Sequence, residues 1–145
     1  MPEQTTSSIV IDATVAQVMA VIVDFEAYPA WAQGMKEVHV VTRDASGRAE
    51  TVHFDLEAAP IKDSYTLAYR YEGDETLRWT LAEGKMLRGM EGSYELAAAG
   101  NGTRVTYQLS VDVAIPMIGL LRRKAEKVII DTALKGLKKR VESLG

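Results

Sequence analysis

The chain has 145 residues, of which 47% are hydrophobic and 26% charged, and its formal net charge is −3. This length and balance are typical of a single globular domain and exclude wholesale disorder, collagen-like repeats and coiled-coil rods. The chain contains no cysteine, which excludes disulfides, a thiolate nucleophile and a cysteine zinc site.

The beginning of the chain predicts one strand and two short helices. Residues 7–12 alternate apolar and polar side chains, as a half-buried strand does. Asp12 or Thr14 can cap a helix that ends at about Val23, because apolar residues then recur at helical spacing. A second short helix is expected over residues 28–33.

Residues 35–113 switch to a period of two, which predicts six antiparallel strands, and four of the turns between them fix a register. The turns are centred on Gly47, on Gly73 to Glu75, on Glu83-Gly84 and on Asn101-Gly102. Each turn fixes a register that places mostly apolar residues opposite one another. The predicted pairs include Val38–Phe54, Val40–Val52, Leu67–Leu81, Tyr69–Trp79, Tyr71–Leu77, Leu81–Met86, Leu77–Met90, Leu96–Tyr107 and Tyr94–Leu109.

The last element is a long amphipathic helix from Pro116 to about Ser143. Its predicted apolar stripe consists of Ile118, Leu121, Ala125, Val128, Ile129, Ala133, Leu137 and Val141. Residues 116–145 also carry eight basic and three acidic side chains, which is typical of a solvated helix face or of an anion-binding surface. Because the whole chain is acidic, we expect no nucleic-acid partner.

This order of elements favours an α+β fold in which a seven-stranded curved antiparallel sheet surrounds the long C-terminal helix. The apolar face of the sheet and the apolar stripe of the helix each need a partner, and they can cover one another. No linker, repeat or low-complexity tract interrupts the chain, so a single domain is expected over residues 1–145.

Three short stretches resemble one family. They are Asp-Phe-Glu-Ala-Tyr-Pro-Ala-Trp over residues 24–31, Gly-Ser-Tyr over 92–94 and Leu-Lys-Gly-Leu-Lys over 134–138. With the element order, they resemble the START-like (SRPBCC) superfamily, and most closely its polyketide cyclase/dehydrase and coenzyme-Q-binding branch. The resemblance implies a helix-grip fold with a deep cavity for lipids, polyketides, quinones or other apolar molecules. It also implies that some members are cyclases and that many are carriers.

The inward face of the predicted sheet, together with the helix, supplies the candidate ligand-binding residues. Aromatic rings, adaptable methionines and small helix residues on this face are typical of a cavity, although each of them also suits a plain core. The candidates are Phe54, Tyr69, Trp79, Met86, Arg88, Met90, Tyr107, Met117, Leu121, Ala125 and Ile129.

Arg88 is the anomalous member of this set. The predicted register places it on the apolar face, opposite Trp79, where a buried guanidinium needs a partner. It could stack on Trp79, pair with an acid or hold an anionic group of a ligand. Alternatively, a bulge at Gly89 or Gly92 turns Arg88 out to solvent.

The two histidines form a second candidate site. The first hairpin sets His39 opposite His53, with Glu37 opposite Asp55 beside them, and imidazoles with carboxylates can hold a transition metal. These four residues alternate with the apolar residues of the same strands and should therefore face solvent. We expect ordinary surface pairs, with no metal and no cofactor.

The sequence contains no recognised catalytic motif and only two histidines, so no catalytic residue is assigned. We expect a protein that binds or carries a hydrophobic small molecule. A polyketide-type cyclase or dehydratase in the same cavity, or an interaction module that uses the basic helix, are the alternatives.

The segment 114–121 places Met117 and Leu120 near the predicted cavity rim, which leaves a transient membrane contact open. The sequence has no basic and apolar leader, and no apolar run approaches the about 20 residues of a membrane span, so we expect a cytoplasmic protein. The identity of the ligand and the oligomeric state are not determined by the sequence.

Overall fold

The structure is a computed structural model that describes residues 4–58, 61–113 and 119–144. Its elements are β1 (Thr5–Ile11), α1 (Val15–Ile22), the 3₁₀ helix η1 (Phe25–Ala30), β2 (Met35–Arg43), β3 (Ala49–Ala58), β4 (Ile61–Glu72), β5 (Thr76–Glu83), β6 (Leu87–Ala99), β7 (Gly102–Val113) and α2 (Gly119–Leu144). The seven strands form one antiparallel sheet in the order β1-β7-β6-β5-β4-β3-β2. The predicted α+β helix-grip architecture is therefore confirmed.

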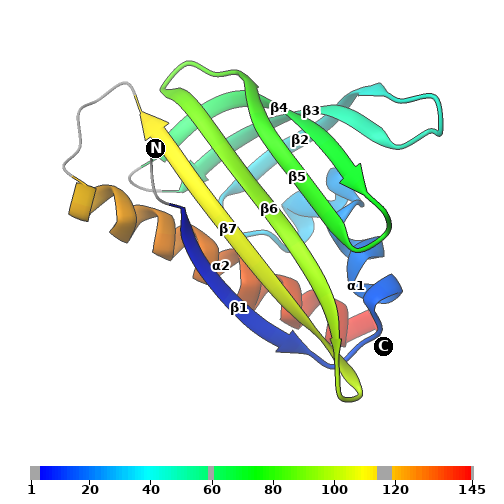
Figure 1. Ribbon diagram of the computed structural model, residues 1–145. Coiled ribbons are helices and arrows are strands. Elements are labelled where there is room, and N and C mark those ends of the chain that lie inside the picture. Colours follow the sequence, from blue (N-terminus) through cyan, green and yellow to red (C-terminus); the bar gives the residue numbers. More distant parts are fainter. Residues whose placement is uncertain (1–3, 59–60, 114–118, 145) are drawn as a thin grey trace.

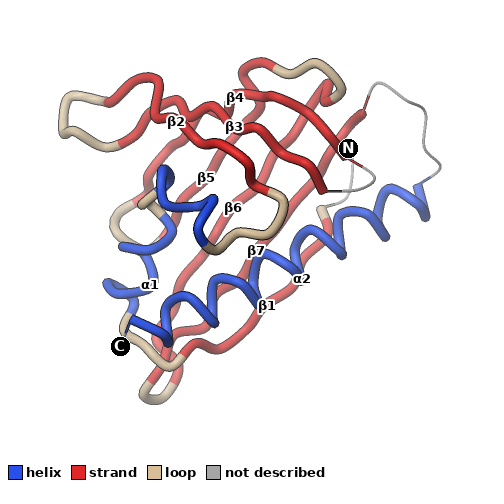
Figure 2. Tube along the Cα trace, turned by 180° about the vertical axis from the view of Figure 1, so that it is seen from behind, coloured by secondary structure: helices blue, strands red, loops and turns tan. Residues whose placement is uncertain are grey.

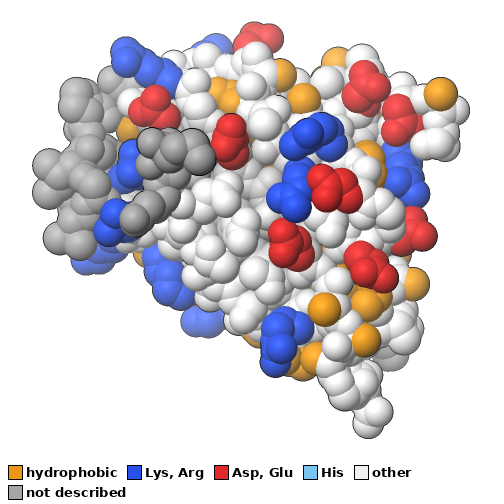
Figure 3. All heavy atoms as spheres, in the orientation of Figure 1, with side chains coloured by type: hydrophobic (Ala, Val, Ile, Leu, Met, Phe, Trp, Pro, Cys, Tyr) orange, Lys and Arg blue, Asp and Glu red, His pale blue; other side chains and the backbone are white. Residues whose placement is uncertain are grey.

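The sheet curves around α2, and the helices lie on its concave side (Figure 1 and Figure 2). Its convex face carries acidic and basic side chains mixed together (Figure 3). One example is Arg78 on β5, which pairs with Glu72 at 2.7 Å and with Glu95 at 3.4 Å. The apolar residues are thereby left to the concave side, where the core and any cavity must lie.

A capping box fixes the start of α1. Thr14 is the N-cap, because its hydroxyl accepts a hydrogen bond from the Gln17 backbone at 3.2 Å and the Gln17 side chain accepts one from the Thr14 backbone at 2.9 Å. The second helix begins earlier than predicted, at Phe25, and contains Pro29. The Tyr28 hydroxyl donates to the Ile22 carbonyl oxygen and so ties η1 to the end of α1.

The predicted registers of β2 with β3 and of β4 with β5 are confirmed. Val38 lies opposite Phe54, and Tyr69 lies opposite Trp79. In the first hairpin Gly47 adopts φ 89°, and the Asp44 backbone N–H donates to the Arg48 carbonyl oxygen at 2.8 Å. Glycine tolerates this left-handed conformation, and the turn therefore sets the register of both strands.

The predicted register of β5 with β6 is wrong by four residues. Trp79 lies opposite Gly92 instead of Arg88, because the pairing of β5 with β6 stops at Thr80 and Glu91 and the connection is much longer than a two-residue turn. The buried Asp63 carboxylate of β4 holds this loop by accepting the backbone N–H groups of Lys85 at 3.2 Å and Leu87 at 2.9 Å. A long-range contact thus overrides the local turn signal.

The register of β6 with β7 differs from the prediction by two residues. Ala99 pairs with Gly102, so the turn consists of Gly100 and Asn101, and Gly100 adopts φ 59°. Glycine at the first central position is typical of a type II′ hairpin. A shift of two residues keeps the side chains from Gly89 to Ala99 on their predicted faces, and it brings Tyr94 opposite Tyr107.

Helix α2 packs mainly on β1 and β7. Its buried apolar residues include Leu137 and Val141 as predicted, together with Ile130 and Leu134, which the predicted stripe omitted. Val128, a member of that stripe, is 52% exposed. The predicted helix start at Pro116 lies outside the described residues.

Candidate ligand cavity

A cavity of about 480 Å³ lies between the concave sheet, α2 and the segment that joins η1 to β2. This volume is in the range of small-molecule sites in proteins, about 300–1,000 Å³. The lining residues are Tyr28, Trp31, Ala32, Gln33, Gly34, Met35, Lys36, Phe54, Leu56, Glu57, Tyr65, Leu67, Tyr69, Trp79, Met90, Tyr94, Tyr107, Leu109, Val128, Ile129, Thr132 and Ala133.

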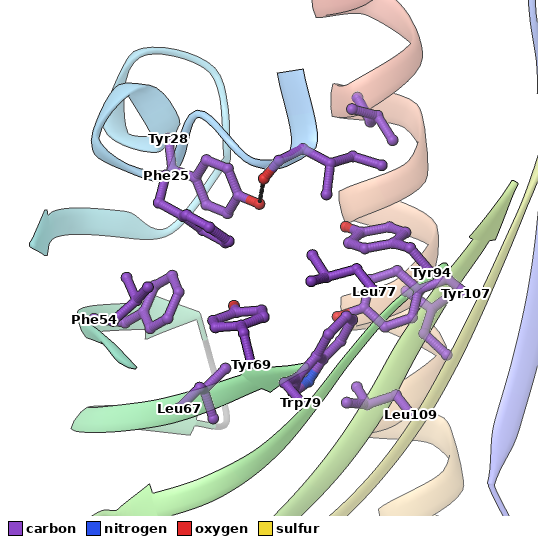
Figure 4. Close-up of a cluster of buried hydrophobic side chains, with 14 of the residues drawn as sticks. Phe25, Tyr28, Phe54, Leu67, Tyr69, Leu77, Trp79, Tyr94, Tyr107 and Leu109 are labelled. Carbon is purple, nitrogen blue, oxygen red and sulfur yellow. Dashed lines mark hydrogen bonds between the residues drawn. The ribbon is translucent and has the colours of Figure 1, made fainter. Parts of the chain in front are cut away.

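Aromatic rings form a continuous wall of the cavity. Trp79 of β5 contacts Tyr94 of β6 at 5.3 Å and Tyr107 of β7 at 5.5 Å between ring centroids. Tyr69 of β4 contacts Trp79 at 5.9 Å, and Phe54 of β3 contacts Tyr69 at 6.5 Å. Figure 4 shows these five rings from neighbouring strands on the concave side of the sheet. The wall offers flat apolar surfaces to a ligand.

Gly92 makes room for this wall. A Cβ atom at Gly92 would overlap the Trp79 ring, at a separation closer than real atoms approach. The Trp79 ring therefore rests on the bare backbone of β6. The Gly-Ser-Tyr stretch thus has a structural role, because its glycine seats Trp79 beside the buried Tyr94.

Four cavity tyrosines have hydroxyls without a hydrogen-bond partner within the described parts of the chain. They are Tyr65, Tyr69, Tyr94 and Tyr107. Tyr28 also lines the cavity, but its hydroxyl is bonded to Ile22. The four hydroxyl oxygens are not among the buried side-chain atoms that lack a partner, so they open onto the cavity and provide polar points on its aromatic wall.

Burial extends to higher pH the range in which these hydroxyls, which are protonated at neutral pH, stay neutral. Removal from water raises the pKa of Tyr65, Tyr69, Tyr94 and Tyr107 well above the ordinary tyrosine value of 10.0. Neighbouring tyrosines raise the pKa values of Tyr65, Tyr69 and Tyr94 further. At neutral pH each hydroxyl can therefore donate one hydrogen bond to a ligand and accept others.

The mouth of the cavity lies where residues 31–36 approach α2. The Trp31 backbone oxygen would be 3.5 Å from a Cβ atom at Gly136, so this glycine lets the two segments pack closely. Among the described lining residues, Lys36 and Glu57 are the charged ones, and both are exposed. The interior of the cavity is thus uncharged in the described parts of the chain.

The structure brings six of the predicted residues to the cavity: Phe54, Tyr69, Trp79, Met90, Tyr107 and Ile129. Met86 and Ala125 do not line it, because Met86 lies in the loop held by Asp63 and Ala125 is buried against other parts of the fold. Met117 and the side chain of Leu121 lie outside the described residues.

The predicted inward position of Arg88 is wrong. A register shift in β6 sets Leu87 opposite Val113 and Gly89 opposite Asp112, so Arg88 is the extra residue of a bulge. Leu87 points inward and is 2% exposed, whereas Arg88 is exposed. The alternative of a bulge next to Gly89 is confirmed, and Arg88 is not available as an anionic anchor inside the cavity.

Several cavity residues were missed by the sequence analysis. Tyr65 alternates with Leu67 and Tyr69 along β4, and this period of two is a signal that could have found it. Tyr28 and Trp31 belong to the family-like stretch 24–31 and line the mouth side. Their positions depend on how η1 packs against the sheet, which local periodicity does not encode.

The histidine pair lies on the convex face. His39 is opposite His53, as predicted. His39 Nε2 is 3.7 Å from a Glu37 oxygen, and His53 Nε2 is 3.4 Å from an Asp55 oxygen, so each histidine pairs with a carboxylate of its own strand. Within the described residues, no group of three or more histidine or acidic side chains is placed to hold a metal ion.

Comparisons with known proteins agree with this architecture. Residues 2–142 match the family model described as "Polyketide cyclase / dehydrase and lipid transport". The comparison with curated proteins finds no match. In the parts of the chain that the structure describes, no helix has the length and apolarity to cross a membrane.

Solved structures share the fold at low sequence identity. A START superfamily protein from Mycobacterium smegmatis has a TM-score of 0.93 and 23% identity, with 99% of each chain covered. A protein from Thermus thermophilus has a TM-score of 0.84 and 22% identity, covering 98% of this chain and 99% of its own. The Zhui aromatase/cyclase from a Streptomyces species has a TM-score of 0.75 and 11% identity, covering 96% of this chain and 93% of its own. Because the family model spans nearly the whole sequence, the chain belongs to the polyketide cyclase/dehydrase and lipid transport family.

Proposed function

We propose that the protein binds one uncharged small molecule in this cavity, as a carrier or binding protein. The ligand combines flat apolar rings with oxygen atoms that accept hydrogen bonds, as quinones and aromatic polyketides do. The observation that carries the proposal is the set of four neutral tyrosine hydroxyls without partners on an aromatic wall. Apolar surface provides affinity, and a few placed polar groups provide orientation.

The charge distribution supports an uncharged ligand. Arg88 points to solvent, and Lys36 and Glu57 are confined to the mouth. A carboxylate deep in the cavity would have no cation beside it among the described residues, and burial of an unpaired charge costs several kcal/mol. An acidic ligand would therefore have to keep its carboxylate at the mouth.

The chemistry of the lining supports binding without turnover. General acid–base catalysis works best with a group whose pKa lies near the working pH. The described lining residues include no histidine and no aspartate, and burial raises the pKa values of the tyrosines away from neutrality.

A second candidate is a cyclase or dehydratase. One observation favours it, since a neutral tyrosine hydroxyl can donate to a ketone oxygen and polarise it. Conversion of a bound polyketone probe would support this candidate, whereas its release unchanged would support a carrier.

The hydroxyls can be tested one at a time. Tyr94→Phe and Tyr107→Phe remove a hydroxyl and keep the ring, so affinity for 2-naphthamide should fall about two- to tenfold per variant. Affinity for naphthalene, which accepts no such bond, should stay unchanged. Calorimetric titration measures both.

Tyr71→Phe is the matched control, because the Tyr71 hydroxyl donates to the Ala49 carbonyl oxygen at 2.7 Å and Tyr71 does not line the cavity. Equal affinity of wild type and both cavity variants for 2-naphthamide would contradict the assignment of the hydroxyls as ligand donors.

A further inference from the structure

The face of α2 next to the cavity mouth carries three exposed lysines, Lys124, Lys135 and Lys139. None of the three has an acidic partner within the described ranges of the chain. They recur at three-, four- and seven-residue spacing from Val128 and Thr132, which line the mouth. Residues at this spacing share one face of a helix, so the lysines border the entrance.

The acids of the same helix do not neutralise this row. Asp131 pairs with Lys127 at 2.7 Å, and Glu142 pairs with Lys138 at 2.8 Å. The Lys138 ammonium also donates to the Val10 carbonyl oxygen at 2.8 Å, on the β1 side of the helix. These pairs use lysines of the β1 side, and they leave the positive charge of the mouth side uncompensated.

Apolar atoms lie beside these charges. Val128 is 52% exposed at the mouth, and Ala32, Met35 and Ile129 are partly exposed around it. On the other side of the mouth, Lys36 adds an exposed ammonium group. Glu57 is the one acid among the described lining residues, so the four lysines leave the rim with a net positive charge beside its apolar atoms, unlike the mixed charges of the convex face in Figure 3.

We infer that this lysine face docks the cavity mouth on an anionic membrane surface. The inference rests on the proposed function and names where the ligand is exchanged. Lysines beside apolar residues are typical of helices that lie at a membrane surface, whereas lysine is depleted at protein–protein interfaces. Docking in this orientation lets an apolar ligand pass between the bilayer and the cavity without crossing water.

Vesicle flotation tests the inference. The protein should float with vesicles of phosphatidylcholine mixed with phosphatidylglycerol, but not with pure phosphatidylcholine, and high salt should release it. Each lysine near an anionic surface contributes about fivefold in affinity, so Lys135→Gln with Lys139→Gln should weaken vesicle binding roughly 25-fold. Val128→Ser should weaken it too.

The double variant Arg70→Gln with Arg104→Gln is the matched control. It removes two exposed positive charges from β4 and β7, on the convex face of the sheet and away from α2. Equal losses in the two double variants would overturn the inference, as would binding to soluble heparin without binding to vesicles. Titration of 2-naphthamide without vesicles separates the two proposals. If 2-naphthamide binds normally but the protein does not float with anionic vesicles, only the docking inference is overturned.

Discussion

The tyrosines decide what the cavity can hold. Five of them, Tyr28, Tyr65, Tyr69, Tyr94 and Tyr107, line the cavity, and burial raises the pKa of each above the ordinary value. The rings of Tyr69, Tyr94 and Tyr107 contact Trp79, and the Phe54 ring joins Tyr28 and Tyr65 to Tyr69. The same burial that makes the wall apolar thus keeps its hydroxyls protonated.

Alkaline titration follows from these pKa values. The unfolded chain releases its phenolic protons near pH 10, whereas the folded chain retains them, so the stabilisation is present below about pH 10 and is lost as the pH rises further. Each buried tyrosine should cost about 1.4 kcal/mol of stability per pH unit above that point. We expect cooperative unfolding above about pH 10. Phenolate absorbance and circular dichroism, recorded in the same titration, measure it.

The two signals should change together. If phenolate absorbance rises at the ordinary tyrosine pKa while the circular dichroism is unchanged, the cavity tyrosines are solvated and the account of their protonation is wrong. The double variant Tyr94→Phe with Tyr107→Phe removes two of these groups, and its unfolding midpoint should lie at higher pH provided that its stability at neutral pH is unchanged.

At the scale of elements, Glu126 joins α2 to the sheet. Its side chain is 0% exposed. One carboxylate oxygen accepts from the Thr5 hydroxyl at 2.6 Å and the other from the Val111 backbone at 2.7 Å. The β1–β7 pairing begins at Thr5 and Leu109, so Val111 lies beyond the first pair of the two strands. Glu126 supplies the acceptor for its backbone N–H. It therefore fixes the beginning of the helix next to the cavity.

Two substitutions of Glu126 should distinguish the contribution of its hydrogen bonds to stability from that of its packing. Glu126→Leu leaves the Val111 N–H without an acceptor and should lower the free energy of unfolding by about 2–3 kcal/mol. Glu126→Gln keeps one acceptor oxygen and should cost about 1 kcal/mol. Urea denaturation measures both, with the exposed Asp131→Asn as a control that should change little. Leu and Gln variants of equal stability would contradict this role.

The sequence predicted elements best where local chemistry fixes them. Gly47 and Gly73 define tight turns, and the registers on either side of them are confirmed. The β5–β6 register failed because Asp63, more than twenty residues away, widens the loop through backbone hydrogen bonds. The bulge at Arg88 also depends on a long-range contact, because it is defined by the pairing of β6 with β7.

The whole molecule is a curved sheet that closes on one helix and leaves an uncharged aromatic cavity between them. Six predicted residues line this cavity. A register error of two or four residues leaves each side chain on the same face of the sheet, because side chains alternate with a period of two. Residues of η1 and of the mouth were not predicted, since they depend on packing between distant segments. The sequence also did not predict that the interior of the cavity is uncharged while lysines lie at its mouth, because this depends on the three-dimensional packing.

The central claim is that the cavity selects uncharged ligands, and one titration tests it most directly. The calorimetric affinities of the wild-type protein for 2-naphthamide and for 2-naphthoate should be compared at neutral pH, where the acid is ionised and the shapes are matched. The account predicts that the amide binds at least about tenfold more tightly, because a carboxylate finds no cation inside the cavity. Equal or tighter binding of 2-naphthoate would contradict the claim.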